Sequence, residues 1–166
     1  MKNYLLVPML CFALLSAGCA ARQTAITNLP TGVTQSEVQN WDTAVKNLDI
    51  IAQSVSTARQ TIVPLCTPSA ANPTPVIPQS YCKVILTDIG KIASAEFSAD
   101  QLLEQTPSNW GTSTANQVGQ YISQITTLLF DLTNNGVVGI KDAVTAQSID
   151  ALLNTIRASA VIIQAL

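Results

Sequence analysis

Apolar residues recur every three or four positions in four separate segments, and this spacing constrains the fold more than any other feature of the sequence. Residues three and four apart share one side of an α-helix, so each segment presents an apolar stripe. No segment shows the convincing apolar/polar alternation of a strand. The stripes are Val38, Trp41, Val45, Leu48, Ala52 and Val55; Tyr81, Ile85, Ile89, Ile92, Ala95, Ala99, Leu102 and Leu103; Val118, Ile122, Ile125, Leu129 and Leu132; and Ile149, Leu153, Ile156, Ala160 and Ile163.

Local signals mark where these helices begin and end. Thr34-Gln35-Ser36-Glu37 has the form of a capping box, which predicts a helix start at Thr34. Pro64 disfavours helical geometry in the residue before it, so we expect this first helix to end near Val63. The other boundaries are predicted at Gln79, before Thr106, at Asn134-Asn135-Gly136 and before Val144.

Four amphipathic segments joined by mostly short connections predict an all-α fold, an up-down antiparallel four-helix bundle over residues 34–166. The chain is 48% apolar and 11% charged, which is enough apolar surface to bury a core. The same stripes could also serve a coiled coil, so the oligomeric state stays open.

The first residues have the pattern of a secretory signal. Lys2 precedes an apolar run from Leu5 to Leu15 that is too short to span a membrane. Leu15-Ser16-Ala17-Gly18-Cys19 resembles the lipobox of bacterial lipoprotein precursors. The resemblance implies that residues 1–18 are cleaved and that Cys19 carries a diacylglyceryl group and an acyl chain such as palmitate. The alternative is an ordinary signal peptide with an incidental cysteine.

The lipobox resemblance also implies a location. Two or more acyl chains anchor a protein stably, and residues 19–33 would then be the lipidated cysteine and a flexible tether. In bacteria of the enteric type, an aspartate after the lipidated cysteine is typical of inner-membrane retention, and this chain has Ala20 there. We therefore expect a lipid-anchored protein of the outer membrane that faces the periplasm.

The four cysteines predict one disulfide. Cys11 would leave with the signal peptide and Cys19 would be acylated, so Cys66 and Cys82 remain in an oxidising compartment. A redox-active or metal-binding pair is disfavoured, because the spacing is not CxxC and the chain has no histidine.

Composition argues against several function classes. The absence of histidine excludes imidazole catalysis and histidine-ligated metals, and no Gly-rich phosphate loop occurs. The serines have no plausible base nearby, so we expect no enzyme activity. A net charge of −2 is not that of a basic nucleic-acid binder, so no nucleic-acid partner is expected.

The twelve residues from Asp131 to Asp142 resemble a calcium loop of the EF-hand or dockerin type. Side-chain oxygens fall at Asp131, Thr133, Asn135 and Asp142, with a glycine at the sixth position. Only two are carboxylates, so any calcium binding should be weak, and a plain turn between helices is the alternative. No other cofactor is expected.

Two further features could form surface sites. Glu96, Asp100 and Glu104 share one helical face, which could collect a cation or a basic partner or could simply be solvated. Trp110, in a loop beside Gly111, could anchor an interface or pack in the core, whereas Trp41 belongs to the first stripe and is expected in the core.

These features favour a non-enzymatic helical scaffold or interaction module that contacts another envelope component, most simply an envelope protein. The alternative is a module that binds an apolar ligand or lipid between its helices.

Overall fold

The structure, a computed structural model, describes residues 29, 31–68, 73–136 and 140–166. This part of the chain is helical and contains no strand. Its elements are α2 (Gln35–Cys66), α3 (Gln79–Gln105), α4 (Thr112–Asp131), the π-helical turn η1 (Leu132–Gly136) and α5 (Ala143–Gln164). The predicted signal peptide and Cys19 lie outside the described residues.

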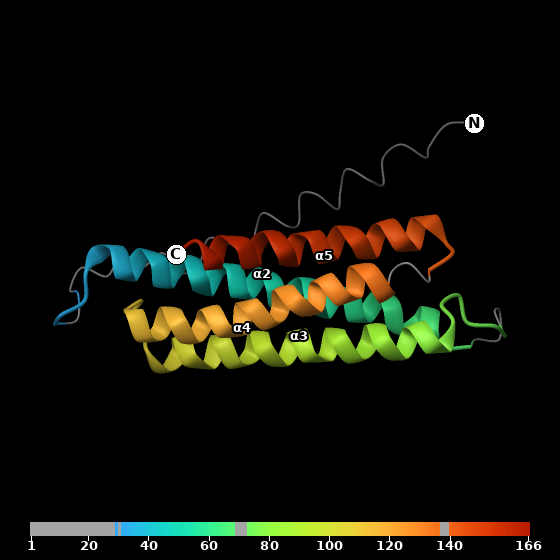
Figure 1. Cartoon of the computed structure of the whole chain (residues 1–166), viewed down its shortest axis with the longest axis horizontal. Helices are drawn as coiled ribbons and strands as arrows, with labels where there is room; N and C mark the ends of the chain where they lie inside the picture. Colours follow the sequence, from blue (N-terminus) through green and yellow to red (C-terminus); the bar gives the residue numbers. More distant parts are fainter. Residues whose placement is uncertain (1–28, 30, 69–72, 137–139) are drawn as a thin grey trace, which may run out of the picture. The chain divides into compact units, whose positions relative to one another are not determined.

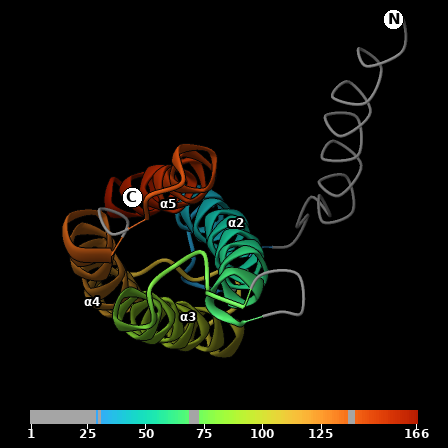
Figure 2. The ribbon, with the colours of Figure 1, turned by 90° about the vertical axis from the view of Figure 1, so that its right-hand side faces the viewer.

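The four α-helices form a bundle in which each helix contacts two others. α2 packs against α3 and α5, and α4 packs against the same two helices. Figure 2, which looks along the helices, shows the ring that results, and Figure 1 shows consecutive helices side by side. These contacts are consistent with the predicted up-and-down order. None of the described helices is long and apolar enough to cross a membrane.

The stripes that the sequence predicts make up most of the core, and residues outside them such as Ile51, Ile62 and Ile77 complete it. Nearly every stripe residue is buried or half-buried, and the most enclosed side chains are isoleucines and leucines. Tyr81 is an exception: it lies in the first turn of α3 and is 37% exposed. The largest side chains that are less than 2% exposed are Leu48, Ile51, Ile62, Ile77, Ile85, Ile92, Leu103, Ile122, Ile125, Leu129, Leu132 and Ile149.

The capping box at the start of α2 is confirmed. The Thr34 hydroxyl accepts a hydrogen bond from the Glu37 backbone N–H at 3.3 Å, and the Glu37 carboxylate accepts one from the Thr34 N–H at 2.7 Å. The Thr34 hydroxyl also donates to the Glu37 carboxylate at 2.7 Å, and the bonds from the Thr34 N–H and from this hydroxyl lower the pKa of Glu37. The pair satisfies two backbone donors that the helix itself leaves unpaired.

The predicted end of this helix near Val63 is wrong, because α2 runs through Pro64 to Cys66. A proline so close to the end of a helix disturbs only its last turn. Tertiary contacts hold that turn in place: the Ile77 N–H donates to the Leu65 carbonyl at 3.1 Å, and Cys66 is bonded to Cys82.

The predicted disulfide is present. The sulfur atoms of Cys66 and Cys82 are 2.03 Å apart and their Cα atoms 5.8 Å apart, at a sequence separation of 16. Cys82 is buried in the first turn of α3, beside the fully buried Ile77 of the preceding loop. The bond therefore joins the end of α2 to the start of α3 across the proline-rich connection.

Trp110 lies in the core. Of the two roles that the sequence leaves open, the structure supports core packing and not an exposed interface anchor. Its side chain is only 6% exposed, and its indole N–H is buried with no hydrogen-bond partner among the described residues. The loop before α4 directs the ring inward: Ser108 has a φ of 61°, and the Asn109 side chain accepts the Gly111 N–H at 2.8 Å. Trp41 is half-buried, and its N–H donates to the Leu103 carbonyl at 3.2 Å.

The two tryptophans should respond differently to substitution. Trp110→Ala should lower the free energy of unfolding by about 3 to 5 kcal/mol, because it leaves a cavity in the core. Trp110→Phe should cost much less, because it keeps most of the apolar surface and removes an unpartnered donor. Trp41→Phe, the control, should cost about 1 kcal/mol through its lost hydrogen bond. Urea unfolding measures the free energy of unfolding of all three variants. Equal losses of this free energy in Trp110→Phe and Trp110→Ala would contradict the conclusion that the Trp110 N–H has no partner.

Candidate functional site

The residues of the predicted calcium loop have structural partners. The Thr133 hydroxyl donates to the Leu129 carbonyl at 2.8 Å and accepts from the Arg157 guanidinium at 3.1 Å. Asp142 caps α5 by accepting the Thr145 N–H at 2.7 Å, and hydrogen bonds from the Thr145 side chain and from this N–H lower the pKa of its carboxyl. Asp131 is the last residue of α4, and the side chain of Asn135 is outside the described residues.

Metal binding at this loop stays a prediction. Within residues 29, 31–68, 73–136 and 140–166, no three or more cysteine or acidic side chains are grouped so that they could hold a metal ion. A positively charged guanidinium bonded to Thr133 would also oppose a cation at that oxygen.

The acidic row on α3 is not uniformly solvated. Glu96 and Asp100 are half-buried, whereas Glu104 is exposed. Burial raises the pKa of Glu96 to about 7, and the negative charges of Asp100 and of Asp49 on α2 add to this rise. Sequence spacing finds the three residues of α3 but not Asp49, because only the packing of α2 against α3 brings Asp49 near.

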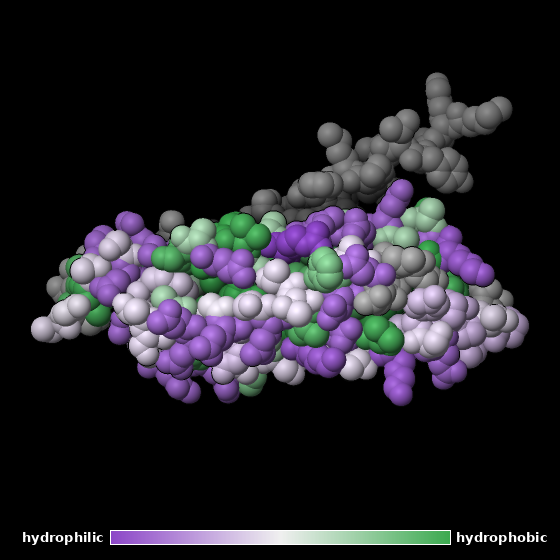
Figure 3. All heavy atoms as spheres, viewed as in Figure 1, coloured by the Kyte–Doolittle hydropathy of each residue, from purple (hydrophilic) through white to green (hydrophobic). Residues whose placement is uncertain are grey.

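A groove of about 700 Å³ runs along the surface between α3 and α4. Four hydroxyl side chains line it: Thr87, Ser94, Ser123 and Thr127. Figure 3 shows the face that carries α4, where hydrophilic and intermediate residues outnumber apolar ones. Helical spacing does not reveal this groove, because its two walls come from different helices and consist of residues that otherwise resemble an ordinary solvated surface.

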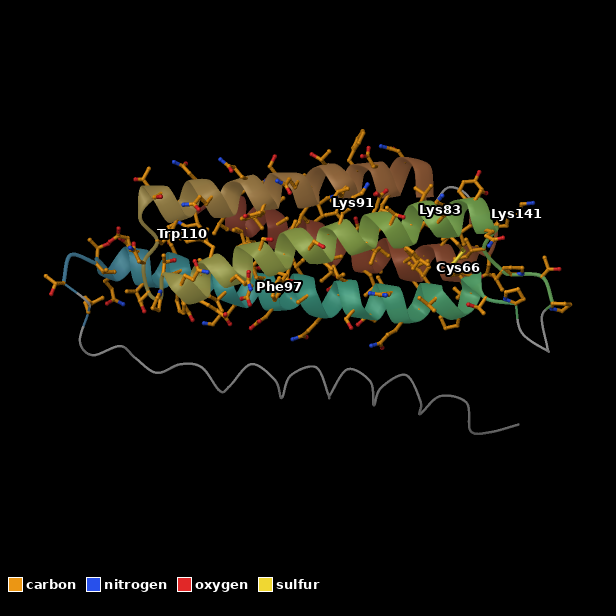
Figure 4. The ribbon with its side chains drawn as sticks, turned by 90° about the horizontal axis from the view of Figure 1, so that it is seen from below. Cys66, Lys83, Lys91, Phe97, Trp110 and Lys141 are labelled. Atoms are coloured by element: carbon orange, nitrogen blue, oxygen red, sulfur yellow. A yellow bond between two sulfur atoms is a disulfide. The ribbon has the colours of Figure 1, made fainter. Side chains whose placement is uncertain are left out.

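Lys91 is the charged residue that lines the groove, and Figure 4 shows it on the side of α3 toward α4. Its ammonium donates to the carboxylate of Asp88 at 2.9 Å. The Lys91 side chain is 59% exposed and that of Asp88 is 12% exposed. The buried carboxylate therefore holds the ammonium at the edge of the groove, and this bond uses one of its three N–H groups.

Gly90 forms part of the groove wall on α3. A Cβ atom built at Gly90 would meet no other atom within 4 Å. Packing within the described structure therefore does not require a glycine at this position, and the missing side chain leaves space in the groove.

The chain matches no protein-family model, no curated protein and no solved structure. The functional interpretation therefore rests on the residues and geometry of this chain.

Glu96→Gln should change how stability depends on pH. In the folded protein Glu96 keeps its proton up to about pH 7, whereas the ordinary pKa of a glutamate is 4.5, so the stability that this group contributes falls as pH rises between these two values. Solvent screens a half-buried group, so the effect should be modest. We expect the free energy of unfolding of Glu96→Gln to exceed that of the parent by on the order of 1 kcal/mol at pH 8 and to equal it near pH 4.

Thermal unfolding from pH 4 to pH 8 measures this difference. Glu104→Gln removes an exposed carboxylate from the same helix and is the matched control. Its stability should fall with rising pH as that of the parent protein does. If the stability of Glu96→Gln fell with rising pH in parallel with that of the parent, burial of the Glu96 carboxyl would not be the cause of the pH dependence.

Proposed function

We propose that this protein is a lipid-anchored, non-enzymatic interaction module of the bacterial cell envelope. In this proposal Cys19 carries the diacylglyceryl and acyl chains, and residues 19–33 tether an up-down antiparallel bundle to the outer membrane on its periplasmic side. The lipobox pattern before Cys19 supports the anchor, and Ala20 supports the outer membrane.

The packed interior of the bundle is the observation that carries the interaction role. A module that holds an apolar ligand needs a cavity between its helices, typically of several hundred cubic ångströms. Here the centre is filled by isoleucine and leucine side chains that expose less than 2% of their surface. The described groove lies on the surface instead, between α3 and α4. Contact through the outer faces is therefore favoured over the alternative, a lipid-binding interior.

The outer faces also carry apolar side chains that could make such contacts. Phe97 on α3 is 58% exposed, and Phe130 on α4 is 66% exposed. Aromatic residues are enriched at the centres of interfaces, whereas isolated exposed apolar residues are common on any surface. Phe97 and Phe130 are therefore suitable positions at which to test for a partner.

The anchor predicts that Cys19→Ser is lost from the membrane fraction or remains as the uncleaved precursor. Cys11→Ser, within the same signal segment, is the matched control and should be processed and fractionated like the parent. Fractionation, intact-mass spectrometry and metabolic labelling with a fatty acid measure the outcome. Unchanged membrane association and size of Cys19→Ser would refute the lipobox interpretation.

The interaction role predicts one dominant envelope partner. A photo-crosslinking amino acid at Phe97 or Phe130 should capture it in intact cells, and the same substitution in the Cys19→Ser background should capture less. Mass spectrometry identifies the product, and organic extraction of the purified protein checks for bound lipid. Self-crosslinks alone, together with a stoichiometric extracted lipid, would replace this proposal with the lipid-binding alternative.

A further inference from the structure

We propose that the groove between α3 and α4 binds an oligosaccharide that carries a carboxylate group. The inference rests on the proposed interaction role and names a carbohydrate as one envelope component that the module contacts.

The lining offers both hydrogen-bond donors and acceptors. The side chains of Thr87, Ser123 and Gln124 line the groove and form no hydrogen bond with the described residues. The hydroxyls of Ser94 and Thr127 each donate at 3.0 Å to a carbonyl of their own helix. Because a hydroxyl also has two lone pairs, both can still accept a bond from a ligand.

This set of groups matches the surface of a sugar. Sugar rings present hydroxyls around their edges and C–H groups on their faces, and the groove combines hydroxyls with the methyl groups of Thr87 and Thr127 and the side chain of Leu128. Most of the exposed lining is apolar, and the four hydroxyls interrupt it; a hydroxyl can donate or accept according to its neighbour, so this mixed wall suits a ligand that presents both C–H faces and hydroxyls.

Lys91 adds a preference for negative charge. Of its ammonium N–H groups, one is directed to Asp88, and the others are available at the groove edge. No other lining residue is charged. A carboxylate on the sugar would form a charge-assisted hydrogen bond with Lys91, which is stronger than a neutral one.

A protein partner is less well matched to this groove. Protein interfaces depend on tryptophan, tyrosine and arginine anchors, and none of these line the groove. The exposed phenylalanines suited to a protein partner, Phe97 and Phe130, are not among the lining residues.

Gly90 allows the groove to be filled without disturbing the fold. A Cβ atom at Gly90 meets no atom beyond its own stretch of helix within 4 Å, and replacing a mid-helix glycine by alanine usually stabilises the helix by about 0.5 to 1 kcal/mol. Gly119 on α4 has the same free space and does not line the groove. Gly90→Leu and Gly119→Leu are therefore a matched pair in which only the first should block a ligand.

The test uses the purified full-length protein in mild detergent, with tetragalacturonate as the acidic probe and maltotetraose as the neutral one. Titration calorimetry should detect saturable binding of tetragalacturonate to the parent. Gly90→Leu should abolish this binding while its melting temperature is equal to or above that of the parent, and Gly119→Leu should bind like the parent. Lys91→Gln should weaken tetragalacturonate binding about tenfold, as expected for the loss of one charge-assisted bond, and leave maltotetraose binding unchanged.

Three results would overturn the inference: no saturable binding of tetragalacturonate to the parent, equal binding by Gly90→Leu, or capture of a protein by a crosslinker placed at Ser123. Because the titration is done on purified protein in solution, it does not depend on the anchor. Failure of the Cys19→Ser experiment would therefore refute the proposed anchoring and leave the groove result intact, and the reverse also holds.

Discussion

The burial of four apolar stripes against one another is the interaction on which the rest of the structure depends. Each fully buried isoleucine or leucine contributes about 1.5 to 3 kcal/mol relative to an exposed one, so no single helix could keep its stripe in water and remain folded. The stripes leave each helix two neighbours and one outward face. Packing of neighbouring helices also brings together residues outside the stripes. The groove, the half-buried Glu96 and the buried Trp110 are all results of this packing.

Much of the fold could be predicted because its signals are local. Helical spacing identifies the core residues, and the capping box at Thr34 and the prolines before Gln79 and after Thr106 place most helix ends correctly. The errors have non-local causes. Pro64 lies inside α2 because the Leu65 carbonyl and Cys66 are held by partners from the next segment. Tyr81 is exposed although its spacing fits; in the same turn Cys82 is buried and is bonded to Cys66 of the preceding helix.

The candidate site was much less accessible to sequence reasoning. The Cys66–Cys82 pair could be deduced by elimination among four cysteines. The groove could not, because Thr87 and Ser123 become neighbours only when α3 packs on α4. Asp49 likewise affects Glu96 only across the contact between α2 and α3. For Trp110, a tryptophan in a loop fits an interface as well as a core position. The turn at Ser108 and Asn109, which directs the ring inward, is visible only in the structure.

The seam between α2 and α5 joins the first and last helices of the bundle, and this has a kinetic consequence. The Asn40 side chain donates to the Leu166 carbonyl across 126 positions, whereas the other seams join consecutive helices. Contacts between distant positions form slowly, because the intervening chain must lose its freedom first. We therefore expect the contacts between α2 and α5 to form later than those between consecutive helices. Until then the apolar side of α2 that α5 covers is open to aggregation.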